Sequence, residues 1–155
     1  MQESLENYPQ SPSLEPVTHR LRVVYKGVTV ADTIEGWLVC EKECAPTYYI
    51  PIADWLPGTL VPAKTGNMTS QWMGRARYYH VVVGHAHAAR AAWAFPEADG
   101  EFAPIRNAVS VYANLMEACF VGREKVLRQS NGYDAGWITP NLTGITQTPA
   151  MTESG

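Results

Sequence analysis

Residues 75–83, RARYYHVVV, decide the fold, because their side chains alternate with the two-residue period of a β-strand. The odd-numbered positions from Arg77 to Val83 fall on one face, and the even-numbered positions from Tyr78 to Val82 fall on the other. Both faces carry bulky groups. We therefore predict a strand that is covered on both sides, or on one side by a ligand. The Gly84-His85 pair that follows predicts a hairpin turn into a second strand.

Strand signals recur on both sides of this hairpin. RLRVVY (20–25) and VTVADT (28–33) flank a Lys26-Gly27 turn, and WLVCE (37–41), TYYIP (47–51), VSVY (109–112) and CFV (119–121) are further short strands. IADWL (52–56) suggests one helical turn, and Pro104 suggests the first turn of a short helix. Many short strands separated by turns predict a mainly β, compact antiparallel domain with at most one or two short helices.

The chain is long enough for one well-buried core, since 46% of its 155 residues are hydrophobic. We place a single β domain at residues 20–145. Residues 1–19 contain three prolines and little apolar patterning, so we expect a disordered or loosely attached arm. Residues 146–155 are expected to form a loose tail, while Trp137 is expected to dock on the domain.

Charge and hydropathy exclude several classes of protein. The net charge is −3 and the twelve Lys and Arg residues are scattered singly, which argues against a nucleic-acid partner. No apolar run approaches the roughly 20 residues of a membrane span. The N-terminus is acidic and polar, unlike a signal peptide. These features predict a soluble, cytoplasmic protein that binds no membrane.

The metal-ligating residues form no complete site. Cys40 and Cys44 have a spacing that suits two zinc ligands, but a structural site needs four and no second pair follows. His85 and His87 lie in or beside the expected hairpin turn, where we expect solvated side chains. Three cysteines also make a disulfide framework improbable. We expect no metal and no cofactor.

A family resemblance rests on RVVYKGVTVADT (22–33), CE (40–41), APTYYIP (45–51), WMGRARYY (72–79) and AAWAFP (91–96), in this order. These segments resemble the domain-of-unknown-function 427 family, also labelled NTP_transf_9, and the likeness covers residues 20–145. The resemblance implies a compact β domain related to the β-tent (Mss4-like) architecture. It implies no assigned activity, since the transferase label is only a lead.

Individual residues also match recurrent positions of that family. They are Glu41, Tyr48, Tyr49, Pro51, Asp54, Trp72, Gly74, Ala76, Tyr78, Trp93, Tyr112 and Trp137. The chain departs from the family at Met73, where a Lys commonly precedes the Gly. A ligand or phosphate contact made by that Lys elsewhere would be missing here.

Our first functional hypothesis is a small-molecule pocket with aromatic walls, which suit flat or cationic ligands. The alternative for each ring is an ordinary place in the core. Glu41 and Arg77 would be the polar groups that orient the ligand. The candidate ligand-binding residues are Tyr48, Tyr49, Trp72, Arg77, Tyr78, Trp93 and Tyr112.

Two further hypotheses belong to other classes. In an enzyme, Glu41 with Tyr48 or Tyr49 would perform acid–base chemistry, because a carboxylate against aromatic walls has a raised pKa. Nucleotidyl transfer is disfavoured, since the sequence has no phosphate-binding loop or paired metal-binding carboxylates. In a structural or protein-interaction module, exposed strand edges would favour a homodimer.

Overall fold

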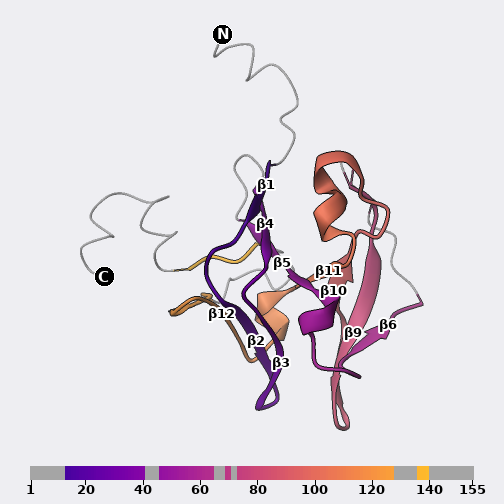
Figure 1. Ribbon diagram of the computed structural model, residues 1–155. Coiled ribbons are helices and arrows are strands. Elements are labelled where there is room, and N and C mark those ends of the chain that lie inside the picture. Colours follow the sequence, from indigo (N-terminus) through magenta and orange to yellow (C-terminus); the bar gives the residue numbers. More distant parts are fainter. Residues whose placement is uncertain (1–12, 41–45, 65–68, 71–72, 128–135, 140–155) are drawn as a thin grey trace.

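Two antiparallel sheets form the body of the domain (Figure 1). The computed structural model describes residues 13–40, 46–64, 69–70, 73–127 and 136–139. The larger sheet has seven strands in the order β1-β4-β5-β11-β10-β9-β6. Its members are β1 (Ser13–Pro16), β4 (Trp37–Cys40), β5 (Thr47–Pro51), β6 (Leu60–Pro62), β9 (Arg77–Val83), β10 (Ala86–Ala94) and β11 (Ala108–Val111).

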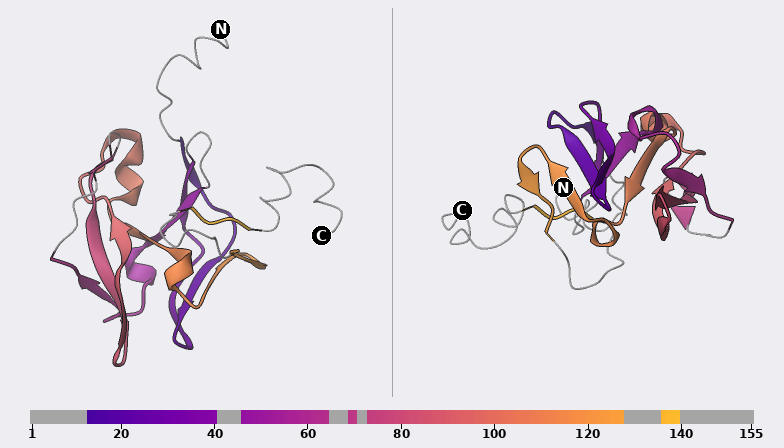
Figure 2. Two further views of the ribbon diagram at one scale, coloured as in Figure 1. Left: turned by 180° about the vertical axis from the view of Figure 1, so that it is seen from behind. Right: turned by 90° about the horizontal axis from the view of Figure 1, so that it is seen from below.

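The smaller sheet has four strands in the order β13-β12-β2-β3. The strands of the smaller sheet are β2 (Leu21–Tyr25), β3 (Val28–Thr33), β12 (Ala118–Val121) and β13 (Glu124–Lys125). Figure 2 shows both sheets from behind and from below. A separate two-stranded ribbon pairs β7 (Thr69–Ser70) with β8 (Gly74–Arg75).

Helical structure among the described residues consists of three short 3-10 segments: η1 (Ile52–Asp54), η2 (Gly100–Ile105) and η3 (Ala113–Leu115). The first two occupy the places where the sequence predicts a helical turn and a short helix. No helix of the described part of the chain is long and apolar enough to cross a membrane. The mainly β fold class is confirmed.

Both predicted hairpins are present. Tyr25 pairs with Val28 across a two-residue turn in which Lys26 and Gly27 both have positive φ, 51° and 78°. That geometry belongs to the type I′ turn, whose twist matches the flanking strands. The second hairpin joins β9 to β10 through the Gly84-His85 turn, with Val83 opposite Ala86. Residues 20–33 and 75–94 therefore fold as local sequence patterns dictate.

The N-terminal arm was predicted to extend to residue 19, but the sheet already begins at Ser13. β1 pairs with β4 from Ser13 opposite Cys40 to Pro16 opposite Trp37, so residues 13–16 belong to the sheet and not to the arm. β1 is an edge strand with mostly exposed side chains, which explains why its polar sequence carries no strand period. Residues 1–12 and 140–155 lie outside the described residues.

The larger hydrophobic cluster lies between the two sheets. It takes Leu21 and Val23 from β2, Val81 from β9, and Val109 and Val111 from β11, all of them fully buried. Trp137 also belongs here: its side chain is 0% exposed, and its indole N–H donates to the Val111 carbonyl at 3.0 Å. The expected docking of Trp137 on the domain is confirmed.

The smaller cluster covers the opposite face of the larger sheet. Tyr49 from β5 and Trp93 from β10 pack here against Phe102 and Ile105 of η2. Arg106 follows η2 and donates from its Nε to the Ala98 carbonyl, which ties the segment to the loop after β10. The strand predicted for residues 75–83 is therefore covered on both faces. Tyr79 and Val81 face the larger cluster, and Tyr78 packs against the smaller one.

Candidate functional site

A hollow of about 390 Å³ opens where the loop after β6, the β8–β9 stretch and the loop after β10 meet. It contains two of the predicted ligand-binding residues, Arg77 and Tyr78. Its lining comprises Pro62, Ala63, Lys64, Arg75, Ala76, Arg77, Tyr78, Pro96 and Glu97. We call it the basic hollow.

Strand pairing brings the walls of the basic hollow together. β6 pairs with β9 up to Pro62 opposite Tyr79, and the Ala63 N–H donates to the Tyr78 carbonyl at 2.9 Å. Pro62 lacks an N–H and ends the strand, so the chain leaves the sheet at Lys64 beside Tyr78. This pairing places Lys64 next to Arg77, thirteen positions later in the sequence.

The third wall is held by Glu97. Its carboxylate accepts a long hydrogen bond of 3.5 Å from the Arg75 backbone N–H. Gly74 permits this approach: its φ is 88°, and a Cβ there would lie 3.2 Å from the Cβ of Glu97. A side chain at position 74 would therefore crowd Glu97 and strain the backbone.

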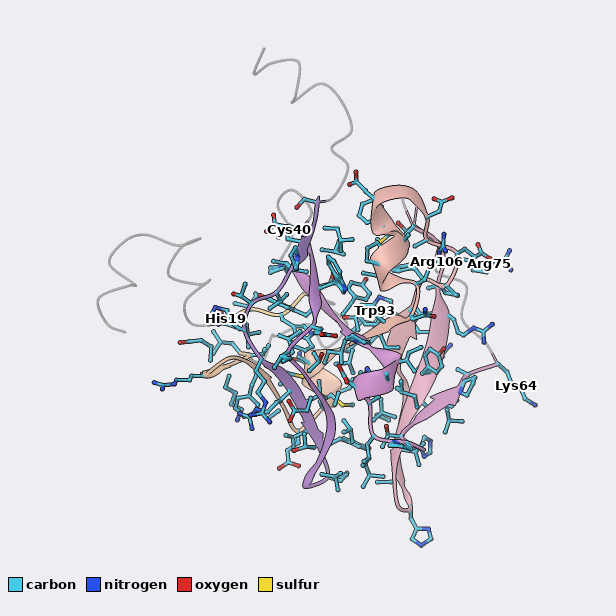
Figure 3. The ribbon with its side chains drawn as sticks, viewed as in Figure 1. His19, Cys40, Lys64, Arg75, Trp93 and Arg106 are labelled. Atoms are coloured by element: carbon cyan, nitrogen blue, oxygen red, sulfur yellow. The ribbon has the colours of Figure 1, made fainter. Side chains whose placement is uncertain are left out.

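Positive charge dominates the basic hollow. Lys64, Arg75 and Arg77 contribute +3 and Glu97 contributes −1, which leaves +2 in a chain whose total charge is −3. All three cationic residues are exposed, and none forms a salt bridge with a carboxylate of the described residues. Figure 3 shows Arg75 and Lys64 on the same side of the molecule. A concave surface with unpaired charge of one sign attracts ligands of the opposite sign.

The aromatic residues predicted to form a cage divide between two faces of the larger sheet. Tyr48 packs against the larger cluster and stacks on Trp137, with ring centroids 5.1 Å apart. Its neighbour Tyr49 points the other way into the smaller cluster. Tyr48 and Tyr49 thus belong to different clusters, and neither lines the basic hollow.

Trp93 is the centre of the aromatic group on the smaller cluster's face. Its side chain is 2% exposed, its Nε1–H donates to the Tyr49 hydroxyl at 3.3 Å, and its ring lies 4.7 Å from that of Tyr112. None of these three residues lines the basic hollow. Tyr78 connects the two regions, since it stands opposite Trp93 in the β9–β10 ladder and also forms part of the hollow's wall.

Two candidate residues, Glu41 and Trp72, lie outside the described residues, and so does Cys44. Burial, with the negative charge of Cys40 as a smaller cause, raises the pKa of the Tyr48 phenol. A raised pKa keeps this phenol protonated near neutral pH. Tyr48 therefore lacks the ionised form that a tyrosine base requires.

A second hollow, of about 320 Å³, lies between η3 and β12 and contains none of the predicted residues. Its Glu117 carboxylate is occupied by the Gly27 N–H at 2.7 Å, and its Cys119 thiol is buried. Burial strongly raises the pKa of Cys119, so this thiol is a poor nucleophile. Glu117 and Lys125 balance each other in charge, and the second hollow has no electrostatic preference.

The described residues contain no group of three or more His, Cys, Asp or Glu side chains placed to hold a metal ion. Cys40 is free and partly buried, and burial together with the Glu15 charge raises the pKa of its thiol.

Sequence reasoning missed three charged residues of the basic hollow: Lys64, Arg75 and Glu97. Arg75 carried a usable signal, because it stands two positions before Arg77 in the same extended stretch. Lys64 carried none, since only the β6–β9 pairing brings it to Arg77.

Comparison with known proteins gives one finding. The profile of the family described as NTP_transf_9, a domain of unknown function (DUF427), matches residues 13–122, which include both walls of the basic hollow and the aromatic group around Trp93. A search among curated proteins finds no match. The matched span begins at the first residue of β1 and ends at the turn after β12. The chain therefore belongs to the DUF427 family.

Proposed function

We propose that this domain is a binding module for a small, negatively charged molecule, which it holds in the basic hollow. The observation that carries this proposal is the group of three exposed cationic side chains around one concavity, Lys64, Arg75 and Arg77, none of which pairs with a carboxylate of the described residues. Binding sites are concave, with a few polar groups that fix the ligand. A volume of about 390 Å³ lies near the lower end of the range for such sites.

Tyr78 supports the part of the proposal that concerns an aromatic wall. Its side chain is half-buried and packs against the smaller cluster, which fixes its position while leaving part of it in the hollow. A fixed ring is a suitable surface for a flat group of the ligand. In this proposal the aromatic contribution comes from Tyr78, whereas Tyr49, Trp93 and Tyr112 support it from behind.

The other two hypotheses have less support among the described residues. Acid–base catalysis rested on Glu41, which lies outside the described residues. A homodimer rested on strand edges, and β1 and β6 are the edges of the larger sheet, but no described feature selects a partner for them. A cytoplasmic location also stays within the proposal, and its support is the free thiols of Cys40 and Cys119.

The proposal is tested by NMR. Backbone amide shifts of the ¹⁵N-labelled full chain are recorded while small anions, neutral compounds and amines are added. We expect anions alone to shift residues 63–64, 75–78 and 97. The Arg77→Gln variant should lose these shifts, whereas Arg123→Gln, in the exposed β12–β13 turn, should keep them. Shifts that appear elsewhere, or that survive Arg77→Gln, would contradict the proposal.

A further inference from the structure

We infer that the ligand of the basic hollow is a phosphate monoester rather than a carboxylate, an inference that rests on the function proposed above. It follows from the amount of charge in the hollow, the placement of the two arginines, and the single carboxylate of the lining. The first two properties separate a dianion with three acceptor oxygens from a monocarboxylate.

The charge of the lining matches a dianion. Lys64, Arg75, Arg77 and Glu97 sum to +2. A phosphate monoester carries about −1.5 to −2 at pH 7, so it leaves the occupied site close to neutral. A monocarboxylate would leave +1, and an amine would raise the charge to +3. A dianion is favoured over a monoanion because its Coulomb attraction to a lining of charge +2 is larger.

The arginine spacing suits a group with three acceptor oxygens. Arg75 ends β8 and Arg77 begins β9, and both are exposed while Ala76 between them is buried. Both arginines border the same hollow. Guanidinium groups pair with phosphate through two parallel N–H donors, so two of them can engage one phosphate from one side. Lys64, on the neighbouring strand end, adds a point charge.

Glu97 favours a phosphate monoester whose organic group carries hydroxyls or other hydrogen-bond donors. Its position is set by the Arg75 N–H and by the space above Gly74. A carboxylate in the lining repels further anionic groups and accepts hydrogen bonds from ligand hydroxyls. Polyanions such as nucleic acid are disfavoured, since the chain as a whole has a net charge of −3.

Three probes with the same ring and different charges test the inference: phenyl phosphate, benzoate and benzylamine. Their affinities for the full chain are measured by isothermal titration calorimetry at pH 7.5 and low salt, with amide shifts as the map of the site. We expect phenyl phosphate to bind roughly tenfold or more tightly than benzoate, because a hydrogen bond to a charged group contributes about 1.5 to 3 kcal/mol. Benzylamine should not bind.

Variants of the lining give the matched controls. Arg75→Gln and Arg77→Gln should each weaken phenyl phosphate by roughly tenfold, whereas Arg123→Gln should leave it unchanged. Glu97→Gln should strengthen benzoate, because it removes the one negative charge of the lining. Thermal melts confirm that each variant is folded.

The failures are distinguishable. Benzoate binding as tightly as phenyl phosphate, with loss in Arg77→Gln, would overturn the monoester inference and leave the proposed function standing. If no anionic probe shifts residues of the hollow, both are overturned. Tight benzylamine binding at Tyr78 would also overturn both, and would indicate a cation-binding aromatic site instead.

Discussion

Trp93 and Tyr78 stand opposite each other on neighbouring strands, yet they belong to regions with different properties. Trp93 is 2% exposed and lies among Tyr49, Tyr112 and the η2 residues. Tyr78 reaches the basic hollow beside Lys64, Arg75 and Arg77. The first region is a packed interior and the second is an open, charged surface. The aromatic residues around Trp93 are thus interior, whereas exposed cationic side chains border the hollow that we propose as a binding site.

Replacing Trp93 with Ala gives the largest expected effect, a loss of about 3 to 5 kcal/mol in the free energy of unfolding. The reason is that the indole fills the centre of the smaller cluster and its removal leaves a cavity. Urea unfolding measures the change. Tyr78→Ala should cost clearly less, because that side chain is only half-buried. Equal losses of unfolding free energy at Trp93 and Tyr78 would contradict the distinction between a packed interior and the wall of a hollow.

Cys119 gives a second test, through the pH dependence of stability. Burial raises the pKa of its thiol, so the folded state keeps the proton at a pH where the unfolded state loses it. The stabilising contribution is complete below the unfolded pKa of about 8.5 and is lost as the pH rises above it, by about 1.4 kcal/mol per pH unit. Urea unfolding under reducing conditions between pH 8 and 10 should show this slope, and Cys119→Ala should reduce it. Identical slopes in the two proteins would show that the thiol is accessible.

Tyr49→Phe removes one hydroxyl from the interior and should cost about 1 to 3 kcal/mol. The loss arises because the Trp93 Nε1–H, which donates to that hydroxyl, stays buried without it. Tyr78→Phe is the control and should change the free energy of unfolding less, since its ring borders the hollow. Chemical denaturation of both variants decides the point, and a neutral Tyr49→Phe would mean that the indole finds another acceptor.

Arg75→Gln and Arg77→Gln should have the smallest effect on stability, within about 0.5 kcal/mol, because both side chains are exposed and no described carboxylate pairs with them. The same changes should abolish the anion-induced amide shifts. A pair of thermal melts with and without phenyl phosphate checks both statements. Stability loss without ligand would place these arginines in the architecture of the fold rather than in a site.

Local sequence was sufficient for the hairpins and for the fold class. The Lys26-Gly27 and Gly84-His85 turns have the short length and the positive φ that fix strand register, so the strands around them follow from neighbouring residues alone. Trp137 was also predictable as an anchor, since an isolated Trp in a polar tail has few other ways to bury its ring.

The site was only half predictable. Arg77 was identified as a polar group and Tyr78 as an aromatic wall, and both line the basic hollow. Tyr48 and Tyr49 were both candidates for the aromatic wall, and the structure places them in different clusters, away from the hollow. Trp93 was assigned to the same pocket because sequence alone does not show that η2 covers its face.

The amino-acid sequence by itself thus determined a mainly β domain, its hairpins and its family. Only the tertiary structure decided which cluster each face of the larger sheet packs into, that residues 13–16 complete that sheet, and that Lys64 joins Arg75 and Arg77. The physical reason is the range of the interactions. Turn geometry and side-chain alternation act over a few neighbouring residues, whereas pairing between distant strands depends on the whole fold.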